Sequence, residues 1–294
     1  MRVTNNILSN NLLRNLEAAQ GRMDQLQNQL SSGNRINRPS DDPVGIQNAM
    51  RLKSNISSVE QWKSNADEAL SYMNTADSTL GEITSMLQRV KEIAIEGANG
   101  TLSDVGRGAV ADEVAQISDH LKTLANTQVG SKYIFSGTAT DKKLIASDGS
   151  FSLETNDSPV NFEVGNNLSL DISVNGKTLF GDSTSGIFAT LTELKNALTS
   201  NDSAGIDKAL GDIEVDTDNV ITHRTGLGAR MNRMTALQEQ LDYTSGNLQD
   251  NFFGIVSADM ATTITDFTNS QNVYKAALSV GAKIIQPSLV DFMR

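Results

Sequence analysis

The sequence contains no cysteine and few aromatic residues. The absence of cysteine from the 294 residues excludes disulfides, thiolate metal ligands and cysteine nucleophiles. Aromatic residues make up 5% of the chain and hydrophobic residues 38%, which favours helix bundles with narrow seams over one large globular core. The formal net charge is -11 and Lys and Arg form no cluster, so nucleic acid and anionic membranes are poor candidates as partners.

The sequence also lacks long apolar runs. Because no apolar run is long enough to span a bilayer, we predict no membrane insertion. Residues 1–20 contain neither the apolar core nor the small-residue cleavage site of a general secretory signal peptide. We therefore expect that any export of the protein proceeds without a cleaved signal of this kind.

Motifs for catalysis, cofactors and metals are missing as well. The two histidines, His120 and His223, do not occur in a metal-ligand spacing such as HExxH, and there is no GxSxG, P-loop or GxGxxG motif. Asp41 and Asp42 form an acidic pair, but helix capping explains them. We predict that the protein is not an enzyme and has no cofactor or metal site.

Apolar residues recur with the 4-3 spacing of a coiled coil over most of the chain. In the first segment they are Leu12, Leu16, Ala19, Met23, Leu26 and Leu30. Similar spacing predicts long helices over 44–98 and 109–129, the latter with Val110, Val114, Ile117, Leu121, Leu124 and Gln128 in phase. A further helix is predicted over 206–255, with one phase held by Ile206, Leu210, Ile213, Thr217, Val220, Arg224, Leu227, Met231, Met234, Gln238, Leu241, Ser245, Leu248, Phe252 and Ile255. A last amphipathic segment contains Val273, Ala277, Val280, Ile284 and Ile285. At about 1.5 Å per residue, the helix over 44–98 would be roughly 80 Å long, the dimension of a rod.

A polar connector, LSSGNRINRPSDDP (30–43), separates the first two predicted helices. Gly33 is suited to end a helix in the left-handed conformation, Asp42 to cap the next helix, and Pro43 to be its first residue. Pro39 and Pro43 are two of the four prolines in the chain and stiffen the connector. We predict a hinge with capped ends between an inner helix and an outer rod, formed by Gly33, Arg35, Asn37, Pro39, Asp41, Asp42 and Pro43.

The helical period disappears in the middle of the chain. Residues 131–185 are rich in Gly, Ser, Thr, Asn and Asp and contain short alternating segments such as NFEVG and LSLDISV. The Asn-Gly pair in VNGKTLF is typical of a type I′ hairpin turn. These features predict a small β-rich insert that faces outward. We expect deletion of residues 140–185 to be tolerated better than Leu→Asp substitutions in the rods.

The predicted fold is therefore mainly α with a β-rich insert, in which long coiled-coil rod helices from both termini flank a small central β domain. We assign 1–38 plus 256–294 to a terminal coiled-coil domain, 39–132 plus 190–255 to a helical rod domain, and 133–189 to the insert. Because a coiled-coil seam needs a partner, we expect the terminal helices to become ordered on association. The predicted assembly interface consists of Leu12, Leu16, Met23, Leu26, Leu30, Val280, Ile284 and Ile285.

Two stretches resemble a known family. LSSGNRINRPSDDPVG (30–45) resembles the signature that follows the first helix of bacterial flagellins and flagellin-like hook-associated proteins. MLQRVKEIAIEGANGT (86–101) resembles the end of the first long rod helix of flagellins. The segments RPSDDP (38–43) and YIFSGT (133–138) and the ending SLVDFMR are more similar to hook–filament junction members than to filament flagellins, whose acidic pair usually lies in alanine-rich sequence.

The resemblance implies a structural role outside the cell. Such proteins leave through the flagellar type III export channel with an uncleaved N-terminal signal, held by an export chaperone that binds the C-terminal region. A junction member would self-associate in a ring between hook-associated protein 1 and flagellin. Filament flagellin itself is the alternative within the family. A secreted coiled-coil adhesin, with the insert as its binding head, is the alternative outside the family.

Overall fold

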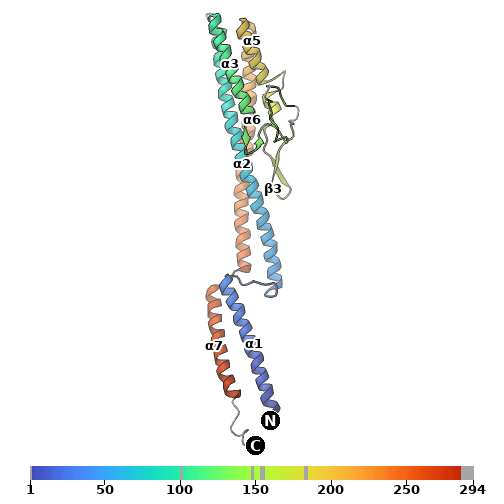
Figure 1. Cartoon of the computed structure of the whole chain (residues 1–294), viewed down its shortest axis with the longest axis vertical. Coiled ribbons are helices and arrows are strands. Elements are labelled where there is room, and N and C mark those ends of the chain that lie inside the picture. Colours follow the sequence, from blue (N-terminus) through green and yellow to red (C-terminus); the bar gives the residue numbers. More distant parts are fainter. Residues whose placement is uncertain (1, 100–101, 147–148, 153–155, 182–184, 286–294) are drawn as a thin grey trace. The chain divides into compact units, whose positions relative to one another are not determined.

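The computed structural model describes residues 2–99, 102–146, 149–152, 156–181 and 185–285 (Figure 1). The chain divides into two compact units. Unit 1 comprises Met1–Ser58 and Thr244–Arg294, and unit 2 comprises Val59–Tyr243. The division falls within two long helices, α2 (Pro43–Ala98) and α6 (Ser203–Val256). The predicted fold class is confirmed, since long helices dominate and the strands are confined to the middle of the chain.

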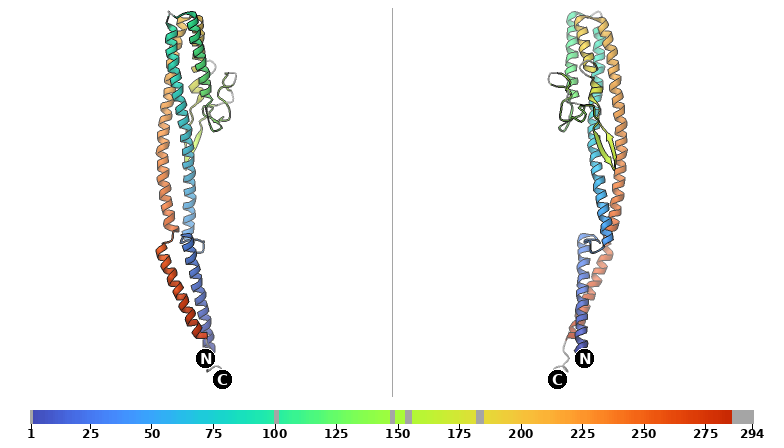
Figure 2. Two further views of the ribbon diagram at one scale, coloured as in Figure 1. Left: turned by 60° about the vertical axis from the view of Figure 1, so that its left-hand side comes forward. Right: turned by 90° about the vertical axis from the view of Figure 1, so that its right-hand side faces the viewer.

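Unit 1 is built from the two ends of the chain. Its main elements are α1 (Arg2–Ser32) and α7 (Met260–Ile285), which lie side by side in both views of Figure 2. The first turns of α2 and the last turns of α6 belong to the same unit. The segments that join these helices, 33–42 and 257–259, are short, so the ends of four helices meet in unit 1.

Unit 2 contains a helical core whose spacing the sequence predicts well. In α6 the residues Ile206, Ile213, Val220, Leu227, Met234 and Leu241 are all buried, one per heptad. In α3 (Asp104–Ala125) the predicted seam residues from Val110 to Leu124 are also buried. The predicted extension of this seam to Gln128 is wrong, because α3 ends at Ala125 and Gln128 is an exposed strand residue. The helix α5 (Ile187–Ser200) packs against α3.

The β structure is small and antiparallel. Strand β1 (Gln128–Val129) pairs with β2 (Lys132–Tyr133), and β3 (Asn161–Gly165) pairs with β4 (Leu168–Asp171). The β3–β4 hairpin turns at Asn167, whose φ is +56°, a left-handed conformation that Asn adopts more readily than most residues.

The hairpin predicted from the Asn-Gly pair of VNGKTLF is wrong. Asn175 instead caps a short helix, α4 (Gly176–Phe180), and its side-chain oxygen accepts hydrogen bonds from the N–H groups of Lys177 and Thr178 at 2.9 and 3.3 Å. A short polar side chain suits a helix N-cap as well as a turn, so the dipeptide alone could not decide between them.

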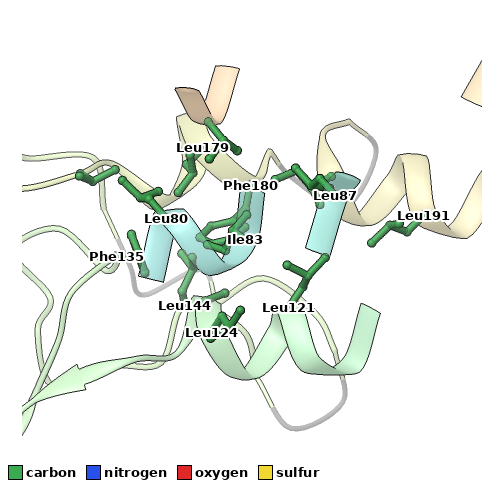
Figure 3. Packing of buried hydrophobic residues seen from close by; sticks show 14 of the residues in the cluster. Leu80, Ile83, Leu87, Leu121, Leu124, Phe135, Leu144, Leu179, Phe180 and Leu191 are labelled. Carbon is green, nitrogen blue, oxygen red and sulfur yellow. The ribbon is translucent and has the colours of Figure 1, made fainter. Parts of the chain in front are cut away.

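The insert shares its hydrophobic core with the rod helices (Figure 3). Phe135 and Phe180 are almost fully buried and meet edge to face, with ring centroids 5.4 Å apart. They lie beside Leu80 and Ile83 of α2 in one continuous cluster. Leu144 of the insert belongs to the same cluster. The expectation that deletion of residues 140–185 is tolerated better than Leu→Asp substitutions in the rods therefore conflicts with the structure, because the deletion would remove part of this core.

Polar contacts also fix the insert to the rods. The Tyr72 hydroxyl donates to the Ile134 carbonyl oxygen at 2.7 Å, and burial raises the pKa of this phenol above its ordinary value. Arg230 on α6 donates to the Ser173 carbonyl oxygen at 2.8 Å and pairs with Asp171 at 3.1 Å. These contacts satisfy main-chain carbonyls at the edge of the insert and hold it in one orientation on α2 and α6.

Candidate assembly site

The connector between α1 and α2 has defined ends. Gly33 follows α1 with φ +71°, and its N–H donates to the Gln29 carbonyl oxygen at 2.9 Å. Asp42 caps α2, because its carboxylate accepts the Gly45 N–H at 2.8 Å, and Pro43 is the first residue of that helix. The left-handed glycine and the aspartate cap each satisfy main-chain groups that a helix end leaves free.

The middle of the connector forms a closed turn. One carboxylate oxygen of Asp41 accepts the N–H groups of Asn37 and Arg38 at 3.1 and 2.9 Å. The Asp41 N–H donates to the Arg38 carbonyl oxygen at 2.9 Å, which encloses Pro39 in the turn. Asn37 donates through its side chain to the Asn34 carbonyl oxygen at 3.0 Å. The connector is thus an ordered structure with its own hydrogen bonds.

Sequence reasoning missed one apolar residue of the connector. Ile36 is only 4% exposed although its neighbours in the connector are polar. A Cβ atom at Gly45 would lie 2.6 Å from the Ile36 Cδ1 atom, so the isoleucine side chain packs closely on the first turn of α2. The sequence does contain a signal for its burial: Ile36 is the one aliphatic residue in the polar segment between Leu30 and Val44.

A second connector, between α6 and α7, pairs with the first. Asn34 and Ser257 form an isolated antiparallel bridge. The Arg35 N–H donates to the Val256 carbonyl oxygen at 2.7 Å, and the Ala258 N–H donates to the Gly33 carbonyl oxygen at 2.9 Å. We call residues 33–36 together with 255–258 the clasp. It joins segments that are more than 200 residues apart in the sequence.

Asp259 caps α7 and was not singled out from the sequence. Its carboxylate accepts the Ala261 N–H at 3.0 Å and the Thr262 hydroxyl at 2.9 Å. Hydrogen bonds from Thr262 and Ala261 stabilise the charged form and hold the pKa of the Asp259 carboxyl below its ordinary value. The sequence signal is present, since DMAT places an acid directly before a helix start.

The predicted seam residues of α1 lie along its contact with α7. Ala19 is buried, and the half-buried residues on the same side are Leu12, Leu16, Met23, Leu26 and Leu30. A Cβ atom at Gly281 of α7 would lie 2.7 Å from the Leu12 Cδ2 atom, so the leucine fills a notch at this glycine. This notch fixes how far α7 can slide along α1.

The described residues of the predicted α7 seam are more exposed than those of α1. Val273 and Val280 are 60% and 53% exposed, whereas Gly281 is buried against α1. The spacing that includes Val280 therefore follows a different side of α7 from the one that receives Leu12. Ile284 and Ile285 belong to α7, but their side chains lie outside the described residues.

The α1–α7 pair is open on one side. A hollow of about 420 Å³ lies between the two helices, and its walls include Arg22 and Leu26 of α1 and Asp266 and Val273 of α7. This hollow opens to the surface, so it forms a groove along the α1–α7 contact in which Leu26 and Val273 remain accessible.

Unit 1 exposes much apolar surface and buries little. Among the described side chains of this unit, the buried apolar ones are Ala19, Ile36, Ala49 and Val256. Most of the large apolar side chains that are exposed in the described part of the chain lie in this unit, namely Ile7, Leu8, Leu13, Val44, Met50, Phe253, Met260, Ile264, Val273, Leu278 and Val280. Exposed apolar side chains that gather on one unit in this way are typical of a protein–protein contact.

The described part of the chain offers neither a helix suited to cross a membrane nor a cluster of metal ligands. None of its helices combines the length and the apolar character needed to cross a membrane. No group of three or more His, Asp or Glu side chains within it is arranged to hold a metal ion. The features that distinguish unit 1 are therefore its apolar surface and its clasp.

The two ends of the chain match two family models. Residues 3–140 match the bacterial flagellin N-terminal helical region, and residues 210–293 match the bacterial flagellin C-terminal helical region. Together these matches cover well over half of the chain and leave out only its centre. The chain belongs to the bacterial flagellin family, whose members are structural proteins of the flagellum and not enzymes.

Individual relatives agree with this assignment. The chain is 35% identical over 127 residues to a flagellin of Clostridium tyrobutyricum, with 43% of this chain and 34% of the relative covered. It thus spans only about a third of that relative. It is 27% identical to a flagellin of Bacillus subtilis, with 97% of both chains covered.

A solved structure supports the fold. The crystal structure of flagellar hook associated protein-3 from Legionella pneumophila superposes with a TM-score of 0.62 at 14% identity. The match covers 70% of this chain and 98% of that one. The fold described above is therefore flagellin-like.

Proposed function

We propose that this protein is the hook–filament junction protein of the bacterial flagellum, hook-associated protein 3. In this role it forms a ring that connects hook-associated protein 1 to flagellin. The observation that carries the proposal of assembly is the surface of unit 1, where α1 and α7 carry apolar side chains that the chain does not cover. Neighbouring copies or neighbouring flagellar proteins would cover this surface.

The assembly interface includes both seam and outward residues. Leu12, Leu16, Met23, Leu26 and Leu30 hold α1 against α7, and we propose that their half-exposed edges also contact neighbouring subunits. Val280 is exposed on α7 and suits a contact with another copy. Burying one such side chain contributes roughly 1.5–3 kcal/mol to association. In a ring each subunit has several neighbours, so the contributions from all its contacts sum to a stable association.

Domain roles follow from this proposal. Residues 1–38 plus 256–294 form the terminal assembly domain, 39–132 plus 190–255 the rods, and 133–189 the insert that faces outward. Export is proposed to use the flagellar type III system, with a chaperone that holds the C-terminal region, and no cleaved signal. The protein would then reside at the cell exterior, at the junction between hook and filament.

Two observations favour the junction over the filament. The connector carries Pro39 and Pro43, as in junction members, and Pro43 is the first residue of α2 next to the cap at Asp42. The fold is similar over most of its length to a hook-associated protein 3. Filament flagellin remains the second candidate, because the Bacillus subtilis flagellin aligns with nearly the whole chain.

Electron microscopy distinguishes these candidates. An epitope inserted between Asn166 and Asn167, two exposed residues at the turn of the β3–β4 hairpin, would be located with gold-labelled antibody on intact flagella. We expect one labelled band between hook and filament. Label along the whole filament would identify a filament flagellin, and flagella without label would refute both.

A deletion strain provides the second readout. Cells without this protein are expected to carry hooks without filaments and to shed flagellin into the medium. If the protein is the filament flagellin, the medium of the deletion strain would contain no shed subunit. Normal filaments in the deletion strain would refute the adaptor role.

A further inference from the structure

One segment of the insert lies along α6 between two hydrogen bonds. At one end of this segment, Arg230 on α6 donates from Nη1 to the Ser173 carbonyl oxygen at 2.8 Å. At the other end, Asn219 on α6 donates from Nδ2 to the Thr178 carbonyl oxygen at 2.9 Å. Asn219 and Arg230 are about three helical turns apart, so residues 173–178, which we call the docked segment, follow α6 in the opposite chain direction.

His223 lies on α6 between these two hydrogen bonds. It follows Asn219 by four residues and precedes Arg230 by seven, so the three side chains project from the same side of the helix. His223 is half-buried, whereas its neighbours Thr222 and Arg224 are exposed. The docked segment is bonded to α6 on both sides of the histidine, which explains why this one position is partly covered.

The surroundings of His223 disfavour a second positive charge. Burial and the nearby Arg230 guanidinium lower the pKa of the His223 imidazole below its ordinary value of 6.5. The docked segment itself contributes a further cation, Lys177. A protonated imidazole under this segment would lose part of its hydration and would be repelled by the guanidinium.

The other titratable groups in this region are already bonded. Acidic side chains on the elements around His223 have partners of their own, namely Asp171 of β4 with Arg230, Asp77 of α2 with Arg224, and Asp216 of α6 with Thr190 of α5. The Tyr72 phenol of α2 donates to a main-chain carbonyl and stays neutral, because burial raises its pKa. A protonated His223 would therefore have to compete with an existing partner for any of these carboxylates.

We propose that His223 makes the docking of the insert on α6 sensitive to pH. The neutral imidazole allows the docked segment to lie on the helix, and protonation releases the segment. Release would extend to the part of α4 that contains Leu179 and Phe180, since these residues follow Thr178 directly and belong to the shared core. The effect is confined to unit 2, and its test does not depend on where in the flagellum the protein resides.

The direction of the effect follows from the lowered pKa. Above pH 6.5 the imidazole is neutral in both the docked and the released state, so docking is at full strength. As the pH falls below this value, the released state binds a proton first, because its histidine has the ordinary pKa, and docking weakens. The weakening is complete once the pH lies below the lower pKa of the docked state.

Amide exchange on the full-length protein, corrected for the intrinsic rate at each pH, measures the docking. The reporters are the N–H groups of Gly176, Leu179 and Gly181, which donate to the carbonyl oxygens of Phe135, Asn175 and Lys177. Amides 194–198 of α5 serve as the internal reference. From about pH 7.5 to about pH 5.5, where histidine titrates and ordinary carboxylates do not, we expect protection of the reporters to fall several-fold and protection of the reference to stay constant.

Three variants assign the titration. His223→Gln keeps a neutral polar side chain and should abolish the fall in protection. His120→Gln is the matched control, because it removes the other of the two histidines, which pairs with Glu82 at 2.9 Å and is exposed. Asp216→Asn removes the acid on the same side of α6 whose pKa is raised by burial. Both controls should retain the fall.

A permanent charge and a direct titration complete the test. His223→Lys should show, at about pH 7.5, the low protection that the wild-type protein reaches at about pH 5.5. In the wild-type protein, NMR titration of the imidazole resonances should give a pKa for His223 below 6.5. A fall that survives in His223→Gln, an equal fall in the α5 reference, the absence of any fall in the wild-type protein, or titration of His223 at or above the ordinary value would each overturn the proposal.

Discussion

Arg224 on α6 and Asp77 on α2 form a bidentate ion pair that links these two rod helices. The Nε atom lies 2.8 Å from one carboxylate oxygen and Nη2 lies 3.2 Å from the other. Arg224 occupies a seam position between the buried Val220 and Leu227. Its guanidinium lies over Gly81, where a Cβ atom would be in ordinary van der Waals contact, 3.5 Å from the guanidinium carbon. The pair fixes the register of α6 on α2 within unit 2.

We predict that Asp77 and Arg224 are energetically coupled. A double-mutant cycle with Asp77→Ala and Arg224→Ala, measured by urea unfolding, should give a coupling free energy of about 0.5–1 kcal/mol, the upper range for a partly exposed pair with good geometry. Arg224→Lys should recover only part of it, because lysine cannot bind both oxygens. Additive effects of the two alanine substitutions would contradict this prediction.

The notch at Gly281 gives a second prediction. Gly281→Ala should weaken the α1–α7 pair, because the new methyl group would overlap the Leu12 side chain. We expect faster amide exchange in α1, and partial restoration in the double variant Leu12→Ala/Gly281→Ala. Gly254→Ala on α6 is the control, since nothing lies within 4 Å of its Cβ position, and it should stabilise the helix by about 0.5–1 kcal/mol. Equal responses of the two glycines would count against the notch.

The shared core of insert and rods gives a third prediction. Phe180→Ala on α4 should lower the free energy of unfolding by about 3–5 kcal/mol, as for other large buried aromatic residues. Lys177→Ala on the same short helix is exposed and should change it by less than about 0.5 kcal/mol. Thermal or urea unfolding of full-length variants measures both. If Phe180→Ala had only the small effect of Lys177→Ala, the insert would be a separate layer.

The cap of α7 predicts a pH dependence. The pKa of Asp259 in the folded protein lies below its ordinary value of 3.8 because Thr262 and Ala261 donate to the carboxylate. The charged Asp259 carboxylate therefore stabilises the start of α7 fully at pH values above 3.8, the ordinary pKa. This stabilisation is lost as the pH falls through the lower pKa that Asp259 has in the folded protein. The protection factors of the amides at residues 261–263, that is, their exchange rates measured by NMR and corrected for the intrinsic rate at each pH, should fall on acidification below about pH 4 in the wild-type protein.

Two variants at this position separate charge from capping. Asp259→Asn should keep the start of α7 ordered and remove its dependence on pH, because Asn is a good cap without a charge. Asp259→Ala should expose the same amides at every pH. A pH dependence that survives in Asp259→Asn would assign the titration to another group.

Much of this fold is predictable because heptad spacing records burial directly. The seam of α6, from Ile206 to Leu241, and that of α3, from Val110 to Leu124, are correct because each helix has one partner side in unit 2. In α7 apolar residues occur on more than one side, and Val280 is exposed and lies away from Leu12, so its place in the assembly interface stays a prediction. A sequence pattern cannot show which of several apolar sides meets its own chain.

The remaining misses concern tertiary contacts of single residues. Ile36 is buried because a glycine lies opposite it on α2, at Gly45, and the sequence gives no sign of this pairing. Asn175 caps a helix because Phe180 and Leu179 are drawn into the core, which favours a helical turn over a hairpin. The clasp joins positions 34 and 257, and no local pattern predicts a bridge between such distant residues.

The bridge between Asn34 and Ser257 also constrains the order in which the molecule can fold. Contacts between residues far apart in a chain form slowly, because a long loop must close before they exist. A chain that is synthesised or delivered from one end cannot complete unit 1 until nearly all of its length has emerged, whichever end leads. The surface that neighbouring subunits would recognise is then the last part of each new molecule to mature, so an incomplete chain cannot be incorporated prematurely.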